Sequence, residues 1–204
     1  MTLEEFRQLI YQHTDDQLLG PCLYQDSTPY VFSPKPTAWT AFRNELATVL
    51  TISPADIRVV GSGRFGYSMK PWKNLAKFRD SSDIDVAIVN NVLFDELWLS
   101  LLRAAYPRPP FTERLGGWLK DRRHEVYTGW ITPLQIHLDM SIFGRRARAV
   151  LDFKTRWFNA LQKVSQYPPR RHEGLTGRLY RTWQHAELYH LNGFAVLRKS
   201  LTET

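Results

Sequence analysis

Residues 59–89, VVGSGRFGYSMKPWKNLAKFRDSSDIDVAIV, decide both the predicted fold and the predicted site. An apolar strand end leads into a Gly-Ser-Gly turn at 61–63, then a long basic connection, then a second apolar run that opens with two aspartates. The alternation over 82–89 predicts a strand, so Asp83 and Asp85 point to one face. Their carboxylates then stand roughly 7 Å apart, from the rise per residue of a strand. The pair predicts a metal site, whereas one aspartate alone at a strand start often only ends a turn.

The order Gly61-Ser62, then Asp83-Ile84-Asp85 inside an apolar strand, resembles the signature of the nucleotidyltransferase superfamily. That superfamily includes DNA polymerase β, poly(A) polymerases, CCA-adding enzymes, aminoglycoside nucleotidyltransferases and bacterial cyclic-oligonucleotide synthases. The resemblance covers residues 59–89, with a longer connection between its two parts than in compact members. It implies a third carboxylate on a later strand, and the alternating run 134–143 carries Asp139 on its polar face.

The resemblance implies metal-dependent transfer of a nucleoside monophosphate from an NTP or dNTP to a hydroxyl. Mg²⁺, or Mn²⁺, would be held by Asp83, Asp85 and Asp139. The residues that we expect to bind the nucleotide lie in the turn and the basic connection: Gly61, Ser62, Gly63, Arg64, Lys70 and Lys73. Positive charge around the site favours an oligonucleotide, an RNA end or a second nucleotide as acceptor, and a cationic small molecule is disfavoured. By analogy alone, a bacterial defence or toxin role fits this chemistry.

Basic and aromatic residues alternate in the connection between the turn and the aspartates. Lysines at 70, 73 and 77 and an arginine at 79 are interleaved with Trp72 and Phe78. Such a mixture suits phosphate contact together with base stacking. Equally, the aromatic residues could anchor a long surface loop whose lysines are only solvated.

Residues 61–66, GSGRFG, also match the pattern GxGxxG, the dinucleotide-binding fingerprint. That fingerprint requires a helix opening at its third glycine and an acidic residue about twenty positions later at a strand's end. Here Pro71 interrupts the expected helix, and the acids come as a pair at a strand's beginning. A dinucleotide-linked oxidoreductase is therefore the weaker interpretation.

Composition limits the partners and the compartment. With 204 residues, 43% of them hydrophobic, the chain can form a sizeable core, and its net charge of +7 favours polyanionic partners. The single cysteine, Cys22, permits no internal disulfide. No apolar run reaches the roughly 20 residues that span a bilayer, and the start is too acidic for a signal peptide. We expect a cytoplasmic protein with no membrane contact.

The remaining patterns predict an α+β fold: a mixed sheet carrying the aspartates, packed with helices, plus a small helical C-terminal part. We expect a catalytic core at 1–143 and a helical appendage at 144–204. Helices are predicted near the N-terminus and over 37–50, 95–106 and most of 145–201, a strand over 57–60, and a hairpin pairing 124–130 with 134–143.

Two alternatives to the enzyme stay open. One is a catalytically inactive nucleotidyltransferase-like module that binds nucleic acid or a protein partner. Retention of all three aspartates argues against it, because clustered acids in a cationic protein repel phosphate unless metal ions neutralise them. The other is a protein-nucleotidylating (AMPylating) toxin or antitoxin.

Overall fold

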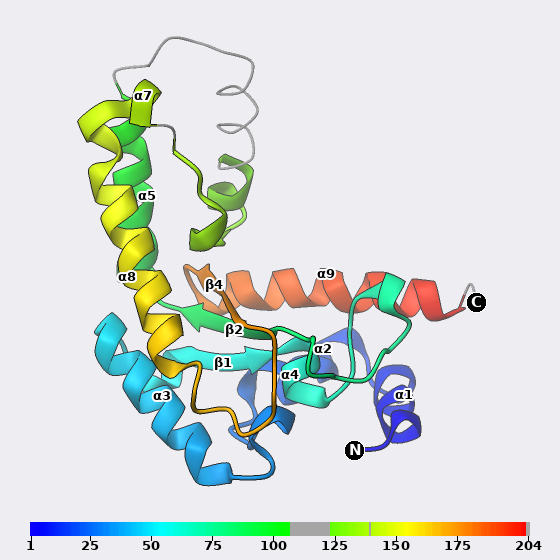
Figure 1. Ribbon diagram of the computed structural model, residues 1–204. Coiled ribbons are helices and arrows are strands. Elements are labelled where there is room, and N and C mark those ends of the chain that lie inside the picture. The colour runs from blue at the N-terminus through cyan, green and yellow to red at the C-terminus, as the bar shows by residue number, and fades with distance from the viewer. Residues whose placement is uncertain (107–122, 139, 203–204) are drawn as a thin grey trace.

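The computed structural model describes residues 1–106, 123–138 and 140–202 and confirms the mixed α+β class (Figure 1). Four strands form one sheet in the order β1-β2-β4-β3. Strand β1 (Ile57–Val60) pairs antiparallel with β2 (Ile84–Val89). Strand β2 pairs parallel with β4 (Leu175–Tyr180), and β4 pairs antiparallel with the short β3 (Trp130–Ile131). The strand expected at 57–60 is thus confirmed, and the one expected at 82–89 begins later, at Ile84, beside it in the sheet.

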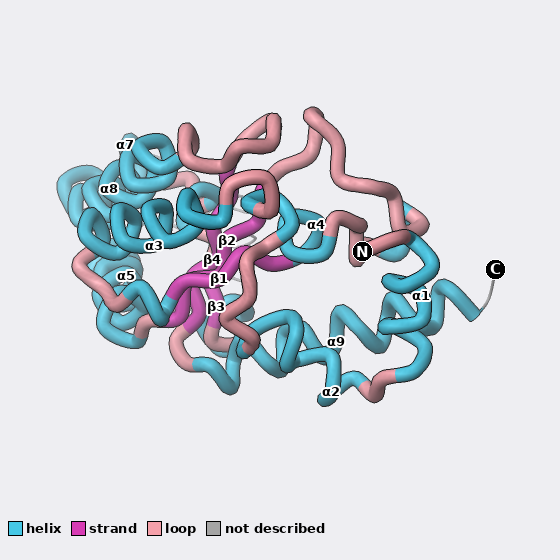
Figure 2. Tube along the Cα trace, turned by 90° about the horizontal axis from the view of Figure 1, so that it is seen from below, coloured by secondary structure: helices cyan, strands magenta, loops and turns pink. Residues whose placement is uncertain are grey.

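Helices cover both faces of this sheet (Figure 2). On one face lie α3 (Pro36–Leu50), α5 (Asn91–Ala105) and α8 (Arg148–Val164), which bury Ile84, Val86 and Ile88 of β2. On the other face lie α1 (Leu3–Gln12), α2 (Asp15–Leu19) and α9 (Trp183–Thr202), against Ala87 and Val89. Because successive strand residues face opposite sides, the single strand β2 contributes to two separate cores.

Short helical turns connect these elements. In chain order these turns are η1 (Gly20–Tyr24), η2 (Tyr30–Phe32), η3 (Pro54–Asp56), α4 (Gly61–Phe65), η4 (Pro71–Lys73), η5 (Pro133–Gln135), α7 (Met140–Phe143) and η6 (Gly144–Ala147). Residues 123–127 are also helical. None of the helices in the described ranges is long and apolar enough to cross a membrane.

The expected hairpin is wrong. Residues 124–127 are helical, and 134–143 contain η5 and α7 instead of a strand. Among the described residues of 124–143, only Trp130 and Ile131 form a strand, β3, and they pair with Tyr180 and Leu179 of β4. Pro133 explains part of the failure, because proline has no N–H to donate to a ladder and instead begins the 3₁₀ turn.

The C-terminal part also needs correction. Residues 144–204 are largely helical as expected, but 175–180 form β4, which lies between β2 and β3 inside the sheet. Leu179 therefore belongs to a strand and not to the last helix, which begins at Trp183. Helix α8 packs on the first face and α9 on the second, so this region completes both cores.

Candidate active site

The Gly-Ser turn and the aspartate pair meet at one end of the β1–β2 ladder. Val60, the last residue of β1, is the register partner of Asp85, and α4 begins at the next residue, Gly61. Gly61 has φ +60°, a conformation that glycine adopts without strain. A Cβ on Gly61 would lie 3.4 Å from Oδ2 of Asp85. The sequence prediction that these two motifs form one site therefore fits the geometry of this sheet end.

The two aspartates differ in exposure and in contacts. Asp83 precedes β2 and is exposed, whereas Asp85 lies within the strand and is half-buried. Thr176 of β4 is the register partner of Asp85, and its hydroxyl donates a hydrogen bond to Oδ1 of Asp85 at 2.6 Å. This bond fixes the Asp85 carboxylate with one oxygen on Thr176 and the other facing Gly61.

Gly174 completes this edge beside Asp83. Its carbonyl accepts the N–H of Ile84 at 2.9 Å, and a Cβ at Gly174 would lie 3.6 Å from Oδ1 of Asp83. The N–H of Glu173 donates to the carbonyl of Ser82 at 3.1 Å, so the β2–β4 ladder extends past the aspartates. The Asp83 carboxylate therefore lies beside Gly174, which has no side chain to cover it, and is exposed to solvent.

A hollow of about 390 Å³ lies among the segments that precede β2 and β4 in the chain. It is lined by the turn before β2 and by the segment that leads from α8 into β4: Asp80, Ser165, Gln166, Pro168, Pro169, Arg170, Arg171 and His172. The Arg170 guanidinium is engaged by Tyr30: it donates a hydrogen bond to the Tyr30 carbonyl at 3.1 Å and lies over the Tyr30 ring. Arg171 is exposed. The charged side chains that line the hollow are thus the acidic Asp80, the tyrosine-bound Arg170 and the exposed Arg171.

The third carboxylate, Asp139, lies outside the described residues, so its place relative to the pair is not assigned. The strand that the sequence predicts for it is absent from 134–138, which the structure does describe. Among the described residues, no three acidic, histidine or cysteine side chains lie close enough together to hold a metal ion. His137, which the sequence places on the same polar face, is exposed.

Behind Asp85, on the same face of the sheet, lies the half-buried Arg178. Its guanidinium lies over the rings of Trp130 at 4.8 Å and Tyr189 at 4.2 Å. Burial alone would lower the pKa of Arg178, but Tyr180, Tyr189 and then Asp85 more than offset it and raise that pKa. Arg178 is therefore a fixed positive charge beneath the acidic pair.

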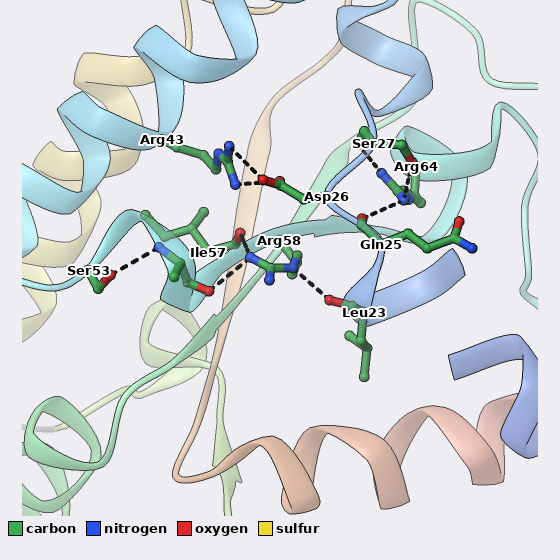
Figure 3. A network of polar contacts seen from close by, with 10 residues as sticks. Leu23, Gln25, Asp26, Ser27, Arg43, Ser53, Ile57, Arg58 and Arg64 are labelled. Atoms are coloured by element: carbon green, nitrogen blue, oxygen red, sulfur yellow. Dashed lines mark hydrogen bonds and ion pairs between the residues drawn. The ribbon is translucent and has the colours of Figure 1, made fainter. Parts of the chain in front are cut away.

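Arg64, one of the predicted nucleotide-binding residues, has structural contacts instead. The Arg64 side chain donates to the carbonyls of Pro21, Gln25 and Ser27, and Figure 3 shows it turned toward this segment. Arg58 of β1 behaves alike and donates to the carbonyl of Leu23 at 2.6 Å. Arg64 therefore ties the N-terminal segment to α4, and we leave it out of the proposed site.

Gly63 faces the core. It is buried, and a Cβ there would lie 3.0 Å from Cγ1 of Val59, so it permits close packing of α4 on β1. Ser62 is half-buried, and its carbonyl accepts the N–H of Gly66 at 2.8 Å. Of the turn residues, Gly61 is the one that borders Asp85, and Ser62 follows it in α4.

Lys70 and Lys73 lie at the two ends of η4, at the tip of a hairpin that leaves the sheet. An isolated bridge pairs Tyr67 with Lys77, and the N–H of Phe78 donates to the carbonyl of Gly66 at 2.8 Å. Both lysines are exposed. In Figure 1 the hairpin runs from α4 toward the C-terminal end of α9, so the tip is directed away from the sheet end.

Thr176 and Gly174 are the site residues that the sequence analysis missed. Their signal is the alternation in Leu175-Thr-Gly-Arg-Leu-Tyr180, where Leu175, Gly177 and Leu179 share one face. That pattern is shorter than the helical periodicity that follows it, and its parallel partner β2 is distant in sequence. A six-residue strand could have been predicted, but not its pairing.

The topology argues against the dinucleotide interpretation. A dinucleotide fingerprint belongs to a βαβ unit with parallel strands, whereas β1 and β2 are antiparallel and α4 has only five residues.

No family model, curated protein or solved structure matches this chain. Inference about function therefore depends on the geometry of this chain itself.

Proposed function

We propose that this protein is a metal-dependent nucleotidyltransferase that moves a nucleoside monophosphate from a nucleoside triphosphate to a hydroxyl acceptor. The observation that carries the proposal is the convergence of Gly61 with the Asp85 carboxylate, since a Cβ added to Gly61 would lie 3.4 Å from Oδ2. A glycine-serine turn against an acidic pair supplies backbone approach for phosphate beside ligands for a cation. The resemblance in residues 59–89 supports the same function.

The donor set fits Mg²⁺. Carboxylate oxygens are its preferred protein ligands, and one or two carboxylates together with substrate phosphates are a common coordination. Asp83 is exposed, and Asp85 keeps Oδ2 free of the Thr176 hydrogen bond. Asp83 and Asp85 would therefore hold the metal, with Asp139 as the proposed further ligand. When bound, Mg²⁺ neutralises phosphate charge and lowers the pKa of an acceptor hydroxyl.

In the proposed reaction, the acceptor oxygen attacks the α-phosphorus and the bond from that phosphorus to the bridging oxygen breaks. Pyrophosphate leaves, and the hydroxyl proton passes to solvent. In this proposal Gly61 and Ser62 border the leaving phosphates, and the exposed Arg171, on the segment that leads into Gly174, supplies further positive charge. Positioning and charge neutralisation supply most of the catalysis in such transfers, so no nucleophilic relay is required.

Thr176 favours a second candidate function. The residue of the neighbouring strand that stands beside Asp85 is this threonine, and it already occupies one oxygen of the carboxylate. A module that binds a nucleoside triphosphate without turning it over is consistent with that arrangement. The two functions share the binding step and differ only in transfer.

Isothermal titration with each nucleoside triphosphate, with and without Mg²⁺, tests the shared step. We expect Mg²⁺ to increase affinity for the wild type, and Asp83→Asn with Asp85→Asn to abolish this increase, because two carboxylate ligands are lost. Asp152→Asn removes one exposed carboxylate from α8 and is the matched control that should keep it. An equal Mg²⁺ effect in the Asp83/Asp85 variant contradicts the assignment.

A further inference from the structure

The hairpin of residues 67–77 presents Trp72 to solvent on a well-anchored support. Trp72 is 78% exposed, while Leu75 is 2% exposed and belongs to the core beneath α9. The N–H of Ser68 donates to the carbonyl of Ala76 at 2.8 Å and closes the stem. Trp72 is therefore presented to solvent by a loop that is anchored through Leu75 in the core.

The tip contains two consecutive residues in the left-handed region. Asn74 has φ 41° and Leu75 has φ 53°, values that non-glycine residues adopt at a cost and only where the surroundings impose them. This turn allows Leu75 to enter the core directly after η4 (Pro71–Lys73), so that Trp72 stays outside. The backbone thus keeps Trp72 on the solvent side of the loop.

Positive charge surrounds this tryptophan. Residues 66–80 carry four basic side chains and one acidic side chain, Asp80, for a net charge of +3. Lys70, Lys73 and Lys77 are exposed, and none of the three forms an ion pair within the part of the chain that the structure describes. An exposed indole with unneutralised lysines on both sides is complementary to a base with its flanking phosphates.

We propose that the 67–77 hairpin binds single-stranded nucleic acid, with a base stacked on Trp72 and the adjacent phosphates on Lys70 and Lys73. An unpaired strand is required because the face of a base in a duplex is covered by its neighbours. A protein partner of acidic character would use the lysines but would gain little from an isolated flat ring.

As an acceptor-binding element, this hairpin deepens the proposed nucleotidyl transfer and in that sense rests on it. Eleven residues separate Trp72 from Asp83, so the two lie at most about 40 Å apart. Because the hairpin tip is directed away from that sheet end, the proposed acceptor is a strand several nucleotides long, held at Trp72 and reaching back to Asp83 and Asp85.

The test is fluorescence anisotropy of a labelled oligothymidylate of about 15 nucleotides, a length within the usual site sizes. No divalent cation or nucleoside triphosphate is present, so the result is independent of the proposed catalytic pair. We expect Trp72→Ala to weaken binding roughly 5- to 100-fold, the range for loss of one base stack, with an unchanged salt dependence. Trp72→Phe should retain most of the affinity.

Lys70→Ala with Lys73→Ala should weaken binding and reduce the slope of log K against log salt by about 1.4, for two single-strand phosphate contacts. Tyr127→Ala, which removes an aromatic side chain that is 85% exposed on another segment, should change nothing. Wild-type affinity in Trp72→Ala, or equal affinity for the same strand in a duplex, would overturn the proposal. Loss of transfer activity with intact Trp72-dependent binding would instead refute only the proposed function.

Discussion

His190 is expected to make the fold sensitive to mild acid. It lies on α9 behind the sheet, where its Nδ1 is 3.8 Å from Sγ of Cys22. Arg178 and Tyr180 of β4 face it from the sheet, and Nε2 has no hydrogen-bond partner among the described residues. Burial, and then the positive charge of Arg178, lowers the pKa of His190 from 6.5 to about 4.

A lowered histidine pKa means that the unfolded chain binds the proton first. The stability contributed by neutral His190 is therefore fully present above about pH 6.5 and is lost as the pH falls toward about 4. At 1.36 kcal/mol per unit, the complete loss is about 3 kcal/mol, of which about 2 kcal/mol falls between pH 7 and pH 5. Most carboxylates stay ionised over that interval, so His190 should dominate it.

Urea unfolding followed by circular dichroism at about pH 7, 6 and 5 measures this loss. In His190→Gln the pH-dependent part should shrink by about 2 kcal/mol, because a neutral amide replaces the titrating group. His137→Gln, at an exposed histidine, should keep the wild-type profile. A wild type whose stability is constant over this interval, or a His190→Gln variant with an unchanged profile, refutes the reasoning.

Two further changes test the packing that positions the site. Gly177→Ala in β4 should lower the free energy of unfolding by about 1–3 kcal/mol, because the added Cβ would lie 2.8 Å from Cζ2 of the buried Trp157. Urea unfolding should then show a lower midpoint with an unchanged slope, and wild-type stability would contradict this prediction. Arg64→Met should leave the carbonyls of Pro21, Gln25 and Ser27 without the hydrogen-bond donor that Arg64 supplies. Limited proteolysis should then cut residues 20–29 faster than in the wild type, and an unchanged cleavage rate would contradict the anchoring role of Arg64.

Local signals predicted the first half of the fold well. The helix expected near the N-terminus is α1, which a capping box of Thr2 and Glu5 begins, and β1 occupies 57–60 as expected. Helix α5 begins earlier than the predicted 95, because Asn90 caps it through a 3.0 Å bond from the N–H of Leu93. These features depend on neighbours within a few residues, which sequence patterns describe.

The second half depends on contacts between distant segments. Trp130 was predicted to pair with 134–143 in a hairpin, but Trp130 and Ile131 pair instead with β4, residues 175–180. Strand β4 in turn needs β2 beside it and Trp157 of α8 over Gly177. Pairing of this kind is selected by tertiary packing, so periodicity alone assigned β4 to a helix. The aspartate pair was predictable, whereas the hydrogen bond from Thr176 was not.

Transfer itself is the most direct test of the central claim. The protein is incubated with each α-labelled nucleoside triphosphate, Mg²⁺ or Mn²⁺ and an oligonucleotide or RNA acceptor, and the products are separated by size. We predict a labelled acceptor with release of pyrophosphate, dependent on the metal and absent in Asp83→Asn with Asp85→Asn. Metal-dependent binding of triphosphate with no transfer to any acceptor, or equal transfer by the Asp83/Asp85 variant, would contradict the claim.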